Sequence, residues 1–284
     1  MGRVIDGRYQ IIEQIGEGQM AAVYLAQQVS MSRNVAVKVL RKDLCADDNA
    51  MVRFRREVEA VARLKSPHTI EFYDYGETPD GALYIAMELL AGETLRDALD
   101  QRGPLPLGET LTIIRQVAMA LGEAHAEGVI HRDLKPENIH LGTRTSPLQP
   151  FVKVLDFGLA KLQEPGDGVG TITGKAVTVG TPAYLAPEAA VAGRVNDWRC
   201  DVYSLGIMVF EMLTGQRPFE ARNPLKMLYQ HATAPIPSAS RLREELPPDV
   251  DIFFQRAMAK DAADRFPSAR SLADALGFVA LSQG

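Results

Sequence analysis

The sequence is poor in cysteine, has no strong excess of either charge and contains no long apolar run. Cys45 and Cys200 are its only cysteines, and they have no spacing typical of metal ligands, so we expect two reduced thiols. The formal net charge is −5 with acids and bases interspersed, which predicts neither nucleic-acid binding nor a membrane-surface patch. No apolar run spans a membrane without a charge, and residues 1–6 lack the apolar core of a signal peptide. We therefore expect a cytoplasmic chain without a membrane segment, either whole or the cytosolic domain of a longer membrane-anchored protein.

The most informative stretch is residues 130–138, Ile-His-Arg-Asp-Leu-Lys-Pro-Glu-Asn. Asp133, Lys135 and Asn138 lie within six positions, and Pro136 interrupts any helix, which predicts a tight loop that brings them together. A carboxylate, an ammonium and an amide suit phosphoryl transfer, because they can respectively accept the proton of an attacking hydroxyl, stabilise phosphate charge and hold a metal ion. The alternative is a charged surface turn of an unrelated fold.

The N-terminal part of the chain predicts strands around a glycine-bearing turn. Residues 9–26 predict two strands joined at Gly16 and Gly18, where backbone amides can approach phosphate oxygens closely. Two glycines in a hairpin are more often only a turn. A further strand, Val-Ala-Val-Lys over residues 35–38, ends in the inward-facing Lys38.

A helix is predicted over residues 47–65, because apolar residues recur at steps of three and four. Glu57 lies beside this apolar stripe and can pair with Lys38, with Glu59 as the second candidate. The alternative for Glu57 is an exposed side chain paired with a neighbouring arginine.

The pattern changes from strand-rich to helix-rich near residue 90, which indicates a boundary between two lobes. Before it, strands are predicted over residues 69–75 and 83–89. After it, residues 142–150 form a polar connector, and a strand over 152–155 ends in Asp156-Phe157-Gly158, where the carboxylate can hold a divalent ion. Helices are predicted over residues 93–101, 107–127, 201–213, 224–232, 249–260 and 268–281.

Together these motifs resemble the protein kinase family over about residues 9–279. The resemblance includes the catalytic loop, the Gly-rich loop, the lysine of the third strand, the Asp-Phe-Gly motif and the Ala-Pro-Glu sequence that ends at Glu188. Lys135 with Pro136 is similar to the serine/threonine branch, and residues 180–188 are similar to bacterial members. Ala21 departs from the family pattern, which has a third glycine there.

The resemblance implies an α+β, bilobal protein-kinase fold. A small N-lobe over residues 1–90 would hold an antiparallel sheet and one major helix, and a larger, mostly helical C-lobe would cover 91–284. The implied activity is transfer of the γ-phosphate of ATP to Ser or Thr hydroxyls of protein substrates, with Mg²⁺ or Mn²⁺. A homodimer would serve trans-autophosphorylation. The alternative is a pseudokinase that only binds nucleotide.

The same resemblance assigns roles to single residues. Asp133 would position and deprotonate the hydroxyl, Lys135 would stabilise the phosphoryl group, and Asn138 and Asp156 would hold metal ions. Lys38, held by Glu57, would orient the α- and β-phosphates. The remaining residues expected around the nucleotide are Ile15, Gly16, Gly18, Val23, Ala36, Met87, Glu88 and Leu90.

His140 is a second departure from the family, which usually places an apolar side chain under the adenine ring at this position. A neutral imidazole could stack on adenine, whereas a charged one would be costly in an apolar pocket. The alternative is a histidine turned toward solvent.

Residues 159–179 lack periodicity and predict a loop. Arg132 and Lys161 would form a basic pocket that a phosphothreonine could fill, and Thr171, Thr173 and Thr178 are the candidates, with a slight preference for Thr173. By resemblance, the substrate-docking segment and its supports include Thr181, Glu188, Arg265 as the buried partner of Glu188, and Asp201 as the anchor of the catalytic-loop backbone.

Overall fold

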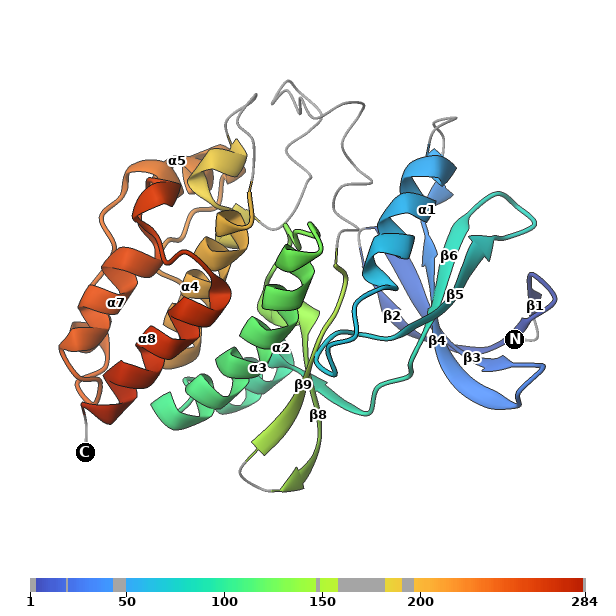
Figure 1. Cartoon of the computed structure of the whole chain (residues 1–284), viewed down its shortest axis with the longest axis horizontal. Helices are drawn as coiled ribbons and strands as arrows, with labels where there is room; N and C mark the ends of the chain where they lie inside the picture. The colour runs from blue at the N-terminus through green and yellow to red at the C-terminus, as the bar shows by residue number, and fades with distance from the viewer. Residues whose placement is uncertain are drawn as a thin grey trace. The chain divides into compact units, whose positions relative to one another are not determined.

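The computed structural model describes residues 4–18, 20–42, 50–146, 149–157, 182–190 and 197–282. The chain divides into two compact units (Figure 1): an N-terminal unit of Met1–Lys65 with Ile70–Ala91, and a C-terminal unit of Ser66–Thr69 with Gly92–Gly284. Seven residues of the sequence-based predictions lie outside the described residues: Cys45, Gly158, Lys161, Thr171, Thr173, Thr178 and Thr181.

The N-terminal unit is built on a six-stranded sheet in which all paired strands are antiparallel, in the order β1-β2-β3-β4-β6-β5. Alternating apolar residues of the central strands, such as Val35 and Val37, are fully buried on one face. The strands are β1 (Val4–Ile5), β2 (Tyr9–Glu17), β3 (Ala21–Gln28), β4 (Arg33–Leu40), β5 (Phe72–Glu77) and β6 (Leu83–Met87).

Helix α1 (Ala50–Val61) packs against β5 through buried apolar side chains, with the Phe54 and Tyr75 ring centroids 6.1 Å apart. The helix ends before residue 65, the predicted end. It ends at Val61, and the N–H groups of Ala62 and Leu64 donate to the carbonyls of Val58 and Val61, which close its last turn. Ser66 to Thr69 belong instead to the C-terminal unit.

The C-terminal unit is mostly helical, and its centre is α4 (Arg199–Thr214), which is buried from Cys200 to Leu213. Gly206 lets α4 approach α7 closely, since a Cβ there would lie 3.0 Å from the Cβ of Ala257. The other helices are α2 (Leu95–Arg102), α3 (Leu107–Ala126), α5 (Pro224–Thr233), α6 (Ala239–Leu242), α7 (Asp249–Ala257) and α8 (Ala269–Leu281).

A second sheet in this unit has the order β7-β8-β9, with β7 (Gly92–Thr94), β8 (Ile139–Ser146) and β9 (Gln149–Val154). The prediction of a polar connector over residues 142–150 is therefore wrong for most of its length, because Ser146 pairs with Gln149 and closes a hairpin. Backbone hydrogen bonds between strands do not require apolar side chains. The predicted strand over residues 69–75 is also corrected: β5 begins at Phe72, and Thr69 forms a parallel bridge with Val154.

Candidate active site

In the N-terminal unit, the glycine-bearing turn joins β2 and β3. The backbone N–H of Gly18 donates to the carbonyl of Ala21 at 2.8 Å, and Gly16 pairs with Val23. Ala21 is buried at the start of β3, so its methyl group packs inside the unit. Ile15 is exposed.

Lys38 lies on β4 between two strands, in register with Val23 of β3 and Ile85 of β6. Two positions before it, Ala36 pairs with the buried Met87. These pairings place the candidate nucleotide-binding residues of β3, β4 and β6 side by side in one sheet.

The two glutamate candidates on α1 differ in their surroundings. Glu57 is half-buried, whereas Glu59 is exposed and accepts a hydrogen bond of 3.0 Å from the Tyr75 hydroxyl. Because Glu59 is held outward by Tyr75, Glu57 remains the better candidate to hold Lys38.

The segment that follows β6 is fixed by two hydrogen bonds between Glu71 and Glu88. The N–H of Glu88 donates to the carbonyl of Glu71 at 3.0 Å, and the N–H of Glu71 donates to the Glu88 carboxylate at 2.8 Å. Leu90, two residues later, is half-buried. The backbone of residues 88–90, the candidate adenine-binding segment, is therefore fixed at Glu88.

In the C-terminal unit, the catalytic loop brings its three polar side chains together. The Lys135 Nζ lies 2.7 Å from Asp133 Oδ2. The Asn138 side-chain amide donates to the Asp133 carbonyl at 2.8 Å and to its Oδ2 at 3.3 Å. Lys135 and Asn138 therefore orient the Asp133 carboxylate, and the short 3₁₀ turn Pro136–Asn138 makes this approach possible.

The backbone of this loop is strained at Arg132, whose φ of 65° lies in the left-handed region. Asp201 of α4 holds it, because its carboxylate accepts hydrogen bonds from the N–H groups of His131 and Arg132, both at 2.9 Å. His125 Nε2 lies 2.8 Å from the same carboxylate. Burial alone would raise the pKa of Asp201, but the hydrogen bond and charge of His125, together with the bond from His131, hold it below its ordinary value.

Asp156 follows β9 with a φ of 58° and lies next to the catalytic loop in the same unit. The Leu155 N–H donates to the Asn138 carbonyl at 2.8 Å, and His131 Nε2 lies 2.7 Å from the Leu155 carbonyl. Phe157 is fully buried against His131, with ring centroids 4.9 Å apart. These contacts bring the segments that carry Asn138 and Asp156 together.

The donor set fits a hard divalent ion, because carboxylate and amide oxygens are its preferred protein ligands. Within the described ranges, no group of three or more His, Cys, Asp or Glu side chains is placed to hold a metal ion. An ion at Asn138 and Asp156 would thus need further oxygen ligands, such as phosphate.

His140 is only 8% exposed on β8. Its Cε1 would lie 3.0 Å from a Cβ at Gly92, which has a φ of 138° and follows the adenine-binding candidates. The alternative of a side chain turned toward solvent is therefore wrong.

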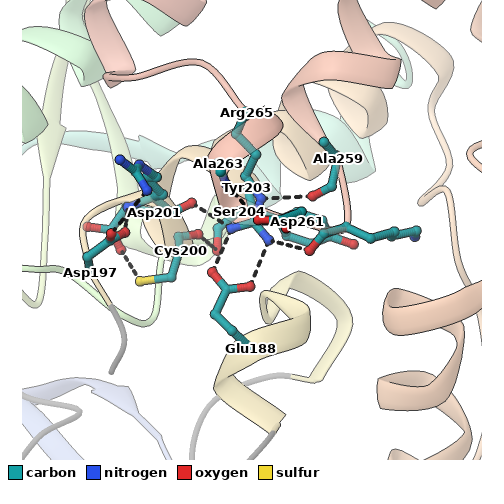
Figure 2. Close-up of polar contacts among 12 residues, drawn as sticks. Glu188, Asp197, Cys200, Asp201, Tyr203, Ser204, Ala259, Asp261, Ala263 and Arg265 are labelled. Atoms are coloured by element: carbon teal, nitrogen blue, oxygen red, sulfur yellow. Dashed lines mark hydrogen bonds and ion pairs between the residues drawn. The ribbon is translucent and has the colours of Figure 1, made fainter. Parts of the chain in front are cut away.

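Glu188 and Arg265 form a two-bond ion pair (Figure 2), with Arg265 Nη1 and Nη2 donating to the carboxylate at 2.6 and 2.7 Å. The Arg265 side chain is fully buried, and its Nε donates to the carbonyl of Ala259. Ser204 of α4 donates to the carbonyl of Tyr184 at 2.7 Å. Tyr184 and Glu188 are thus bonded to residues of the helical C-terminal unit.

Sequence reasoning missed three polar partners of these residues. Glu211 accepts hydrogen bonds from Tyr184 and from Arg96, the latter at 2.7 Å, and is only 5% exposed. His125 supports Asp201, and His231 is buried on α5, a helix that contacts residues 182–184. The one signal for Glu211 was a lone acid in the mostly apolar run over residues 202–213, whereas the two histidines have no distinctive pattern.

A model of the protein kinase domain matches residues 9–275. The chain is 40% identical over 273 residues to the serine/threonine-protein kinase pkn3 of Myxococcus xanthus, covering 95% of this chain and 50% of that protein. It is 38% identical to PrkC of Bacillus subtilis and 40% identical to PknB of Mycobacterium tuberculosis, covering 40% and 42% of those proteins. The chain thus spans half or less of the length of these curated relatives.

Among solved structures, the kinase domain of Mycobacterium tuberculosis PknI is similar, with a TM-score of 0.77, 33% identity and 98% coverage of both chains. This similarity confirms the predicted α+β bilobal fold. None of the helices in the described part of the chain has an apolar stretch long enough to cross a membrane.

Proposed function

The chain belongs to the protein kinase family as a Hanks-type serine/threonine kinase domain similar to bacterial members, and from this premise we propose how its own residues transfer phosphate. The family uses ATP and a divalent metal ion. The observation that supports the proposal most directly is the meeting of Asp133, Lys135 and Asn138 in one loop. The domain transfers the γ-phosphate of ATP to Ser or Thr hydroxyls of protein substrates.

Asp133 orients the substrate hydroxyl and accepts its proton. Because Oδ2 faces Lys135 and Asn138, Oδ1 is the oxygen that takes the hydroxyl proton. Lys135 then stabilises the charge of the phosphoryl group in flight. A general base of this kind contributes about 10²- to 10⁴-fold to the rate.

Lys38, held by Glu57, orients the α- and β-phosphates. Asn138 and Asp156 are the ligands for Mg²⁺, with Mn²⁺ as a substitute, and the ion would neutralise phosphate charge. The nucleotide is proposed to bind along Ile15, Gly16, Gly18, Val23, Ala36, Met87, Glu88, Leu90 and His140, with the phosphates at the two glycines.

Autophosphorylation in trans, between two copies of the chain, is the proposed route of activation. The acceptors are Thr171, Thr173 and Thr178, and the phosphate would pair with Arg132 and Lys161. We place this activity in the cytoplasm, where ATP is available and where the buried free thiol of Cys200 stays reduced.

A pseudokinase is the alternative function, and Ala21 and His140 are the residues that favour it. Ala21 is accommodated inside β3, and the Gly18 N–H bonds its carbonyl, so the turn closes without a third glycine. All the reacting groups are present in the chain. The phosphotransferase is therefore the better supported proposal.

The test is the intact mass of the protein after incubation with ATP and Mg²⁺, for the wild type, Asp133→Asn and Glu137→Gln. Glu137 is an exposed acid four residues from Asp133 and serves as the matched control. We expect added phosphates on the wild type and on Glu137→Gln but not on Asp133→Asn. Peptide mapping then identifies the acceptor threonine.

Phosphate gain in Asp133→Asn at the wild-type rate would refute the role of Asp133. If no variant gains phosphate while ATP still binds, the pseudokinase replaces the present proposal.

A further inference from the structure

His231 is a fully buried histidine on α5 that has no part in the proposed phosphoryl transfer. Its ring packs edge-on against Tyr203 and Phe219, with centroids 5.7 and 5.1 Å away. Lys260 Nζ donates to the backbone carbonyl of His231 at 2.8 Å and lies over the Phe219 ring. A buried imidazole surrounded in this way needs partners for both ring nitrogens.

The surroundings of the two ring nitrogens of His231 differ, and they favour one tautomer. Nδ1 lies 2.9 Å from the hydroxyl of Tyr203, a residue of α4. If the hydroxyl donates to Nδ1, the imidazole proton is on Nε2. The carbonyls of Pro182 and Ala183 favour a proton on the imidazole, and they are the groups available to accept it.

The Nε2 nitrogen is buried and has no short hydrogen bond in the described part of the chain. A buried N–H without an acceptor is unfavourable, so a small shift of Pro182 or Ala183 toward Nε2 would be stabilising. The next residue is already fixed, because Tyr184 is bonded to Ser204 and Glu211. The adjustable part of the segment is therefore Pro182 and Ala183, and residues 182–184 contact α5, the helix that carries His231.

The charge state of His231 suits this role. Burial, together with the positive charge of Lys260, lowers the pKa of His231 to about 4, so the ring is neutral near pH 7. Arg265 and Glu188 are the other charged groups nearby, since the Arg265 guanidinium lies 4.8 Å from the centroid of the Tyr203 ring (Figure 2). A neutral ring with one donor and one acceptor can bridge a hydroxyl and a carbonyl at the same time.

We propose that His231 is a positioning residue for the binding of protein substrates, acting through the carbonyls of Pro182 and Ala183. This inference rests on the proposed function, because the resemblance to protein kinases assigns substrate docking to residues 180–188, which include Pro182 and Ala183. His231 links α4 and α5 to the start of this segment. It sets where a substrate backbone binds and takes no part in ATP binding or in the chemical step.

The first test replaces His231 with Phe, which keeps the aromatic contacts and removes both nitrogens. With a synthetic peptide of residues 168–180 as substrate, we expect the KM for the peptide to rise about fivefold, as the loss of one net hydrogen bond implies. The KM for ATP and the rate of ATP hydrolysis without peptide should stay unchanged. His231→Gln, whose amide can donate from near the Nε2 position, should restore most of the peptide KM.

Tyr203→Phe removes the hydroxyl that fixes the tautomer and should raise the peptide KM in the same direction. Combining it with His231→Phe should add little, because both changes break one bridge. Tyr84→Phe is the matched control: Tyr84 is also fully buried with a bonded hydroxyl, but it belongs to the N-terminal unit. It should leave the peptide KM unchanged.

Hydrogen exchange of the Ala183 and Tyr184 amides tests the positioning without relying on activity. Exchange should be faster in His231→Phe than in the wild type and close to wild type in His231→Gln. If His231→Phe leaves both the amide exchange and the peptide KM unchanged, the inference is overturned. It is also overturned if the KM for peptide and the KM for ATP rise equally, with a lowered melting temperature, in both His231→Phe and His231→Gln. A wild type that transfers no phosphate would instead refute the proposed function, and the exchange result would still decide the role of His231.

Discussion

At the scale of single residues, His140 is one of the two positions, with Ala21, at which the chain departs from the family's motifs. It is buried on β8 and lies against Gly92. A leucine has a similar volume to histidine, and it carries no polar atom that would need a hydrogen-bond partner in an apolar pocket beneath the adenine ring. The imidazole can be replaced without loss only if it makes no specific contact with the nucleotide.

We therefore expect His140→Leu to bind ATP as tightly as the wild type or slightly more tightly. Isothermal titration of the domain with ATP and Mg²⁺ measures the change, and thermal unfolding without nucleotide serves as the control for folding. A loss of tenfold or more in affinity would show that the imidazole makes a specific contact.

The resemblance supplied candidate roles for Asp133, Lys135 and Asn138 because these residues are adjacent in the chain. Adjacency is also why the loop could be predicted as one site. His125 and Glu211 could not be assigned in this way, since their importance comes from partners 76 and 115 residues away in the sequence. A buried polar partner of this kind is visible only once the helices are packed.

At the scale of elements, helix interiors were easier to predict than element ends. Periodic apolar residues located α3 and a nearly continuous apolar run located α4, whereas residues 142–150 of the β8–β9 hairpin were predicted as a connector because they are polar. Hydrogen bonds between backbone groups hold that hairpin, and side-chain patterns do not report them. The C-terminus of α4 was predicted to within one residue: the helix was expected to end at residue 213 and ends at Thr214, where Gly215, with a φ of 76°, caps it.

Two glycine substitutions separate the effect of backbone conformation from that of helix propensity. Gly215→Ala should destabilise the protein by about 1–2 kcal/mol, because an L-residue is strained at positive φ, and the added Cβ would meet Pro104 Cδ at 3.2 Å. Gly122→Ala, at an exposed position inside α3 with nothing within 4 Å, should stabilise by about 0.5–1 kcal/mol. Thermal unfolding of both variants checks the signs. Equal effects would contradict the assigned left-handed cap.

At the scale of the whole molecule, the pair of Glu188 and Arg265 connects the end of the docking segment to the helical core. Arg265→Ala would leave the Glu188 carboxylate buried without its partner and should cost about 3–5 kcal/mol in the free energy of unfolding. The matched control is Arg217→Ala, which breaks the exposed pair with Glu220, whose nitrogen and oxygen lie 3.8 Å apart. That change should cost less than about 1 kcal/mol.

Urea unfolding followed by circular dichroism measures both changes. If Arg265→Ala costs no more than Arg217→Ala, the buried pair does not stabilise the domain, and the docking segment must be held mainly by Ser204 and Glu211.

The pH dependence of stability tests the buried state of His231 in the intact protein. Its pKa falls from 6.5 to about 4 on folding, so between these pH values the unfolded chain binds the proton and the folded chain does not. The contribution of neutral His231 to the free energy of unfolding is therefore fully present above pH 6.5 and is lost as the pH falls toward 4. Between pH 7 and pH 5 this loss should amount to about 2 kcal/mol. Lys260, whose pKa burial and Arg265 lower to about 8, stays charged throughout this range.

The measurement is the free energy of unfolding in urea at pH 7 and pH 5, for the wild type and for His231→Phe. Other groups titrate in both proteins, so the difference between their pH responses isolates His231. We expect the wild type to lose about 2 kcal/mol more than the variant over this range. Equal losses would mean that His231 accepts a proton in the folded state as readily as in the unfolded chain. A protonated ring could not accept the Tyr203 hydroxyl at Nδ1, and the bridge to the docking segment would then have to be abandoned.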